Sequence, residues 1–79
     1  MKVPRDVDAD KLISMLKRHG YVVVRQTGSH VRLSKRLGNE EHNITVPNHR
    51  PIKIGTLQGI ASQVCKFCKL DVGRFYREI

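Results

Sequence analysis

Apolar residues recur at helical spacing near the start of the chain. Between Asp8 and Gly20 they form one stripe, made of Leu12, Met15, Leu16 and, one turn later, His19. Asp8 can accept hydrogen bonds from the free N–H groups of a first helical turn, and Gly20 suits the left-handed position that ends a helix. The pattern therefore predicts an amphipathic helix between these two residues.

The spacing then changes to the period of two that is typical of strands. Residues 21–26, YVVVRQ, are rich in β-branched residues and predict a first strand, and residues 27–29, TGS, can turn the chain. In HVRLSK, residues 30–35, Val31 and Leu33 fall on one face. The opposite, polar face receives His30, Arg32 and Ser34.

A third strand and a second helix complete the pattern. After a turn around Gly38-Asn39, NITV at residues 43–46 predicts a strand that Pro47 ends. Thr56, or a residue just before it, can cap a helix that runs to about residue 68. Its apolar stripe consists of Leu57, Ile60, Ala61, Val64 and Cys68. Asp71 can cap a short terminal helix with Val72, Phe75 and Ile79 on its apolar side.

This order of elements predicts an α+β fold of the α-β-β-β-α type, like that of double-stranded-RNA-binding domains. We expect a three-stranded antiparallel sheet with two helices on one face and a short C-terminal helix. At 79 residues the chain has room for one domain, residues 1–79. No apolar run approaches the about 20 residues that span a bilayer, so we expect a cytoplasmic protein without membrane contact.

Charge is the first indication of a partner. The chain has 15 Lys and Arg against 7 Asp and Glu, a net charge of +8, and neither residues 11–39 nor residues 42–70 contain an acid. Such a surface attracts polyanions and releases their counterions on binding, which favours a nucleic acid. A solubilising surface with no specific partner explains the same charge.

His30 is the strongest candidate for chemistry, because it follows a glycine turn on a basic polar face. RNA carries its own nucleophile, the 2′-hydroxyl, so cleavage needs a base for that proton and cations for the phosphate. Histidine can be that base at neutral pH, with Arg25 and Arg32 holding phosphate. The backbone N–H groups of Gly28 and Ser29 could meet a phosphate oxygen. A solvated strand histidine is the plainer interpretation.

Three short motifs narrow the family. The stretches RQTGSHVRL, NITVPNH and IGTLQGI occur in this order and at compatible distances. Together they resemble the HicA family of toxins from toxin-antitoxin pairs, also called YcfA-like, from the DKLISMLKRHGY segment to GRFYREI. The resemblance implies a ribonuclease that cleaves mRNA, with the histidine of Gly-Ser-His as the essential residue; here that is His30. It also implies a HicB-type antitoxin as partner.

The other histidines and basic residues leave alternatives open. His49 follows the third predicted strand near Arg50 and Lys53, so it could be a general acid or a phosphate ligand, or it could simply cap the loop. We count Lys53 among the phosphate-binding candidates. His19 and His42 are predicted to be structural or surface residues, one at a helix end and the other at a turn.

Cys65 and Cys68 form a CKFC motif with no second pair. A structural zinc site needs about four ligands, so reduced, partly buried thiols are the simpler interpretation, and no metal or cofactor is predicted. The main hypothesis is thus a metal-independent endoribonuclease toxin with His30 as base. The alternative is a non-catalytic RNA-binding module in which Lys and Arg carry function and His30 is incidental.

Overall fold

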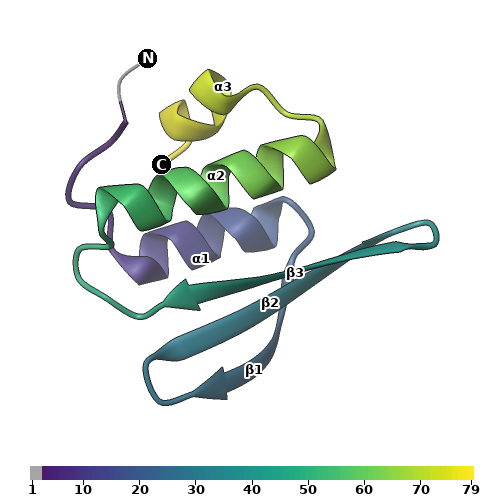
Figure 1. Cartoon of the computed structure of the whole chain (residues 1–79), viewed down its shortest axis with the longest axis horizontal. Helices are drawn as coiled ribbons and strands as arrows, with labels where there is room; N and C mark the ends of the chain where they lie inside the picture. Colours follow the sequence, from purple (N-terminus) through teal and green to yellow (C-terminus); the bar gives the residue numbers. More distant parts are fainter. Residues whose placement is uncertain (1–2) are drawn as a thin grey trace.

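The computed structural model describes residues 3–79 and confirms the predicted order of elements. Figure 1 labels α1 (Ala9–Arg18), β1 (Val22–Thr27), β2 (His30–Leu37), β3 (Glu40–Pro47), α2 (Ile54–Cys68) and α3 (Val72–Arg77). The strands form one antiparallel sheet in the order β1-β2-β3. The α-β-β-β-α arrangement of the α+β class is therefore correct, including the short last helix.

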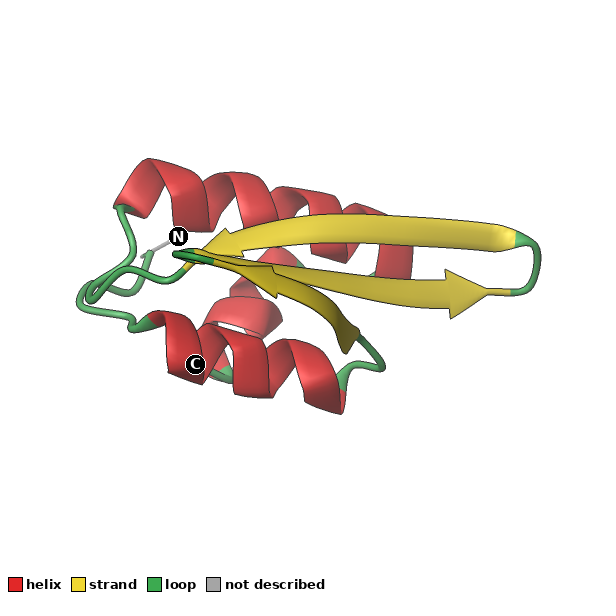
Figure 2. Ribbon diagram, turned by 90° about the horizontal axis from the view of Figure 1, so that it is seen from below, coloured by secondary structure: helices red, strands yellow, loops and turns green. Residues whose placement is uncertain are grey.

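Both long helices lie on the same face of the sheet, as predicted. Figure 2 shows the sheet in front of α1 and α2, with the far end of the β2–β3 hairpin extending beyond the helices. The helix α3 lies on the side of α1 and α2 that is turned away from the sheet (Figure 1). One face of the sheet is thus covered by helices, and the other is open to solvent.

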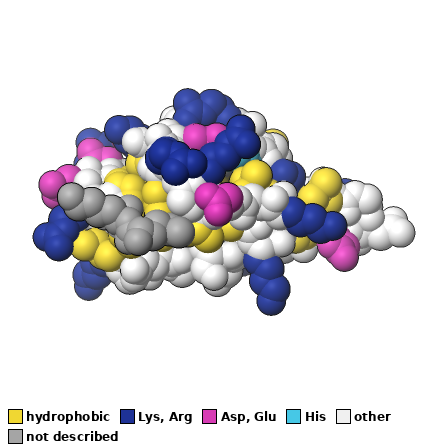
Figure 3. Space-filling view, turned by 90° about the horizontal axis from the view of Figure 1, so that it is seen from above, with side chains coloured by type: hydrophobic (Ala, Val, Ile, Leu, Met, Phe, Trp, Pro, Cys, Tyr) yellow, Lys and Arg dark blue, Asp and Glu magenta, His cyan; other side chains and the backbone are white. Residues whose placement is uncertain are grey.

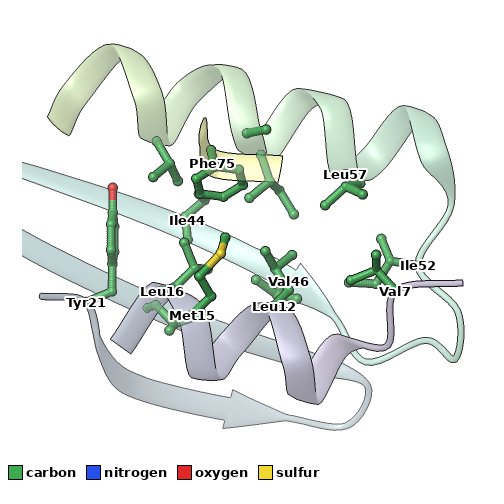
Figure 4. Packing of buried hydrophobic residues seen from close by; sticks show 14 of the residues in the cluster. Val7, Leu12, Met15, Leu16, Tyr21, Ile44, Val46, Ile52, Leu57 and Phe75 are labelled. Atoms are coloured by element: carbon green, nitrogen blue, oxygen red, sulfur yellow. The ribbon is translucent and has the colours of Figure 1, made fainter. Parts of the chain in front are cut away.

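The core fills the space between the sheet and the two long helices (Figure 4). The predicted stripe residues Leu12, Met15 and Leu16 of α1 have no exposed surface, and Leu33 and Val46 meet them from the sheet. Burying one such side chain stabilises the fold by about 1.5–3 kcal/mol. The helical spacing in α1 and the alternation in the strands therefore determine which faces of the helix and the sheet pack together.

The predicted capping of the two long helices is partly wrong. Asp8 is the N-cap of α1, but its side chain makes no capping hydrogen bond; its backbone carbonyl accepts from Lys11 and Leu12 instead. The N-cap of α2 is Lys53, so Thr56 lies inside the first turn. The reason is the buried Ile52, whose N–H donates to the carbonyl of Val7 at 2.8 Å and fixes the chain just before the helix.

The strands also differ from the prediction in extent. β3 begins at Glu40, three residues earlier than expected, so His42 lies within a strand rather than at a turn. Tyr21 precedes β1, and its side chain is buried. Ser34 has the predicted parity but is only 8% exposed, because its hydroxyl donates to Glu41 across the hairpin at 3.0 Å.

The predicted cap of the last helix is correct, whereas Ile79 of the predicted stripe lies beyond the end of the helix and Tyr76 is buried as well. The side chain of Asp71 accepts a hydrogen bond from the backbone N–H of Arg74 at 3.0 Å. Phe75 is buried, and Val72 and Ile79 pack against the core as half-buried neighbours. Asp71 thus fixes the start of α3, and the apolar stripe fixes the side that faces the core.

Candidate active site on the open face of the sheet

β1 contains a β-bulge next to the side chains that share a face with His30. The pairing runs Val22 with Ser34 and Val23 with Leu33, but Arg25 rather than Val24 pairs with Arg32. Val24 is therefore an extra residue. Directly paired residues point to the same side of a sheet, so Arg25 lies on the same face as Arg32. Without the bulge, a strand that kept the pairing of Val23 with Leu33 would turn Arg25 toward the helices.

The residues on this face surround one hollow. It has a volume of about 260 Å³ and is lined by Arg25, Thr27, His30, Arg32 and Thr45, two of which come from β1, two from β2 and one from β3. His30 pairs with Thr27, and Arg32 pairs with both Arg25 and Thr45, so the five side chains form two adjoining rows. Two guanidinium groups and no carboxylate line the hollow, which suits an anion such as a phosphate.

Hydrogen bonds hold this arrangement from two sides. The Nε–H of Arg25 donates to the hydroxyl of Thr27 at 3.3 Å, which directs the guanidinium along β1. Gly28 has a φ of 55°, a conformation that glycine adopts without strain. The carbonyl of Ser29 accepts from the N–H of Asn48 at 2.6 Å, so the turn before His30 is joined to the loop after β3.

The other predicted site residues lie outside this lining. Lys53 is the N-cap of α2, and His49, although exposed, uses its backbone carbonyl to accept from Ala9 at 3.2 Å. The neighbouring Arg50 forms an exposed ion pair with Asp10 at 2.7 Å. Of the predicted site residues, His30, Arg25 and Arg32 line the hollow together, and His49 and Lys53 are not part of its lining.

Thr27 and Thr45 line the hollow but were not among the predicted site residues. Thr45 could have been found, because it lies between the inward residues Ile44 and Val46 and so shares the parity of Arg32. Thr27 could also have been found, because only Gly28 and Ser29 separate it from His30, so a two-residue turn pairs Thr27 with His30 on one face.

A model of the HicA toxin of bacterial toxin-antitoxin systems matches residues 9–64, which is more than half of the chain. This protein belongs to the HicA toxin family. Comparison with curated proteins and with solved structures gave no significant match. The match runs from the start of α1 to Val64 and therefore includes the whole candidate site, whereas α3 lies beyond it.

Membership in the HicA family identifies the chain as the toxin of a toxin-antitoxin pair and implies a cognate antitoxin as partner. The resemblance in sequence runs from Asp10 to the C-terminus, but the family match ends within α2. The CKFC segment and everything after it are thus features of this toxin beyond the matched region.

Two histidines of this toxin have structural contacts, as predicted. The Nε2 of His19 lies 2.6 Å from a carboxylate oxygen of Glu78, which joins the end of α1 to the end of α3. The Nδ1 of His42 shares a 2.7 Å hydrogen bond with the hydroxyl of Tyr21, and its ring stacks on Phe67. Both imidazoles connect elements of the fold.

The cysteines of this toxin are free thiols. Cys65 is buried and Cys68 is half-buried, so Cys65 lies deeper than the predicted stripe residue Cys68. Burial raises the pKa of the Cys65 thiol, and the neighbouring Cys68 and Asp71 raise it further. Within residues 3–79, no three His, Cys, Asp or Glu side chains gather as metal ligands, and no helix is long and apolar enough to cross a membrane.

Proposed function

We propose that this toxin is a cytoplasmic endoribonuclease that cleaves mRNA without a metal ion, with His30 as the general base. The observation that supports the proposal is the shared hollow of His30, Arg25 and Arg32 in a HicA-family chain. A base beside two fixed cations is what phosphoryl transfer from an internal hydroxyl requires.

The proposed reaction uses the 2′-hydroxyl of the RNA as nucleophile. His30 removes its proton while the oxygen attacks the neighbouring phosphorus, and the bond to the 5′-oxygen of the next nucleotide breaks. The products are a 2′,3′-cyclic phosphate and a free 5′-hydroxyl, whose proton comes from the imidazolium or from water. Arg25 and Arg32 neutralise the charge that develops on the phosphate oxygens.

The surrounding residues have secondary roles in this proposal. Gly28 and Ser29 form the turn that presents His30, and their N–H groups can meet a phosphate oxygen. His49 and Lys53 lie outside the hollow, so we assign them contacts with RNA beyond the scissile phosphate. The antitoxin partner is proposed to be of the HicB type.

The test compares purified parent, His30→Ala and His49→Gln on a synthetic RNA and on the same sequence as DNA. General-base catalysis is worth about 10²–10⁴-fold, so His30→Ala should lose at least about 100-fold of the single-turnover rate. RNA affinity should change little. We expect His49→Gln to retain most activity, the parent to leave cyclic phosphate ends, and DNA to stay intact.

If His30→Ala cleaves RNA as fast as the parent, His30 is not the base and the proposal is wrong. If no variant cleaves RNA but all bind it, the protein is a binding module, the alternative that its fold and charge also support. Growth after induced expression of parent and His30→Ala at matched protein levels gives the corresponding result in cells.

A further inference from the structure

The strand β1 has an unusual surface. It is an edge strand, paired on one side with β2, and all six of its residues are exposed. Three consecutive valines are among them: Val22 is 59% exposed, Val23 39% and Val24 55%. Among the described residues only Leu37 and Ile54 are comparably exposed large apolar side chains, and both lie in other elements.

An exposed edge strand carries unpaired backbone N–H and C=O groups, so proteins usually protect it with charges, prolines or bulges. The opposite edge, β3, has this protection: it starts with Glu40 and Glu41 and ends at Pro47. β1 contains no proline, no acid and no lysine, and its protection consists of the bulge and Arg25. Its valines are the residue type that a paired strand prefers.

We propose that β1 is a docking strand for an extended segment of a protein partner, with apolar residues opposite the three valines and Asp or Glu opposite Arg25. The segment would pair with the free edge of β1 and add a fourth strand to the sheet. Its apolar side chains would cover the valines. Its carboxylates would meet Arg25 on β1 and Arg32, which pairs with Arg25 from β2, on a face whose hollow has no acidic lining residue.

Charge decides between this occupant and two others. A second copy of the chain, paired antiparallel along the whole of β1, would set the two Arg25 side chains at adjoining positions and would bring together two molecules of charge +8. RNA would suit the arginines, but valine side chains offer it neither hydrogen bonds nor an aromatic face. An acidic, apolar strand matches both the valines and the cations.

The same strand carries part of the candidate active site. Arg25 and Thr27 belong to β1 and also line the hollow of His30. A segment paired along β1 would therefore lie at the rim of the hollow, and its carboxylates would compete with phosphate for Arg25. This consequence, unlike the docking itself, rests on the proposed function.

The probe is a synthetic peptide, acetylated and amidated, of three Glu followed by three Val, so that antiparallel pairing sets its Val against Val22–Val24 and its Glu against Arg25–Thr27. We expect it to bind the full chain at low salt, to shift the backbone amide signals of residues 22–27 and to slow their hydrogen exchange. A peptide with Lys in place of Glu, and a Glu peptide with alternate N-methylated amides, should not bind. The N-methylated control separates strand pairing from simple charge attraction.

The matched variants are Val22→Thr with Val24→Thr on β1, and Leu37→Thr at the far end of β2. Threonine keeps the β-branched shape, so the strand should still form. Each substitution weakens one apolar cross-strand pair with the peptide, so we expect the β1 double variant to bind it about two- to thirtyfold more weakly. Leu37→Thr, an equally exposed apolar position, should bind it like the parent.

Three results would overturn the proposal. The first is equal binding of the Glu and Lys peptides. The second is a binding site on residues other than β1. The third is a concentration-dependent dimer of the parent that the β1 double variant abolishes, because the occupant is then a second copy. None of these readouts uses RNA, so they are valid whether or not the protein cleaves it. If the parent binds the peptide but does not cleave RNA, the proposed function is wrong and the docking strand is not.

Discussion

Tyr21 shows how a single side chain joins the parts of this small protein. Its ring is buried at the junction of α1 and β1, and its hydroxyl bonds to His42 of β3. His42 in turn stacks on Phe67 of α2 at 5.0 Å between ring centroids. Burial raises the pKa of the Tyr21 phenol, and the nearby thiol of Cys68 adds to this effect. The phenol therefore stays neutral and keeps its proton for hydrogen bonding.

The two cysteines should differ in reactivity. The thiolate is the reactive form, and Cys65 is buried with a raised pKa, whereas Cys68 is half-buried at the end of α2. We expect iodoacetamide at mildly alkaline pH to modify Cys68 at least about tenfold faster than Cys65 in the native protein. Timed alkylation followed by mass spectrometry of the peptides measures both rates. In urea the two rates should converge; equal rates in the native protein would contradict the burial of Cys65.

At the scale of elements, the bulge in β1 leads to a prediction with a matched pair of deletions. Removing Val24 takes out the extra residue, so β1 becomes regular and Arg25 still pairs with Arg32. Removing Gln26 also makes β1 regular, but Val24 then pairs with Arg32 and Arg25 turns toward the helices. The two variants have the same length and differ in where Arg25 points.

We expect the Val24 deletion to bind RNA nearly as well as the parent. The Gln26 deletion should lose about tenfold or more, since a hydrogen bond to a charged group is worth about 1.5–3 kcal/mol. Fluorescence anisotropy with a labelled RNA measures this, with His30→Ala in the parent and in both deletions so that the RNA stays intact, after backbone amide spectra show that both variants fold. Equal affinities for the two deletions would mean that Arg25 does not contact RNA.

Elements with a clear period could be predicted from the sequence, and elements without one could not. The alternation in HVRL and NITV places His30 and Arg32 on the open face, and the structure agrees. The three valines of β1 show no alternation, so neither their exposure nor the bulge at Val24 can be read from them. Local signals also mislead where tertiary contacts decide: the buried Ile52, not Thr56, sets the start of α2.

At the scale of the whole molecule, α3 secures the helical layer. Phe75 is buried and stacks on His19, and Glu78 accepts from the same imidazole. The hydrogen bond from His19 lowers the pKa of Glu78, which outweighs the opposing effect of desolvation. A carboxyl with a lowered pKa stabilises the fold above its unfolded value of about 4.5, and this stability is lost as the pH falls through the lowered pKa.

Glu78→Gln should therefore melt at a lower temperature than the parent at pH 6. The difference should shrink below about pH 4 and vanish at lower pH, because the parent's carboxyl is then protonated as well. Thermal melting followed by circular dichroism across this range gives the comparison. The exposed Glu40→Gln, whose pairing partner across the hairpin is Leu37, is the control and should follow the parent. A difference that persists at low pH would show that Glu78 acts through packing rather than charge.

RNA binding by the overall positive charge has to be distinguished from binding by the hollow around His30. The helical side carries Lys and Arg interspersed with Asp and Glu (Figure 3), and the open face concentrates two arginines around His30. A general field and a local phosphate contact differ in their salt dependence: each phosphate neutralised on a single strand adds about 0.7 to the slope of log K against log salt concentration. The two explanations therefore predict different salt slopes of RNA binding when one positive charge is removed.

Arg32→Gln and Lys66→Gln each remove one positive charge, the first from the hollow and the second from an exposed position on α2. We expect Arg32→Gln to reduce the salt slope of RNA binding by about 0.7 and Lys66→Gln to leave it unchanged. Binding isotherms at a series of salt concentrations measure both, with His30→Ala as the common background so that the RNA stays intact. If the two variants reduce the slope equally, binding comes from the overall charge, and the hollow around His30 is not where the phosphate lies.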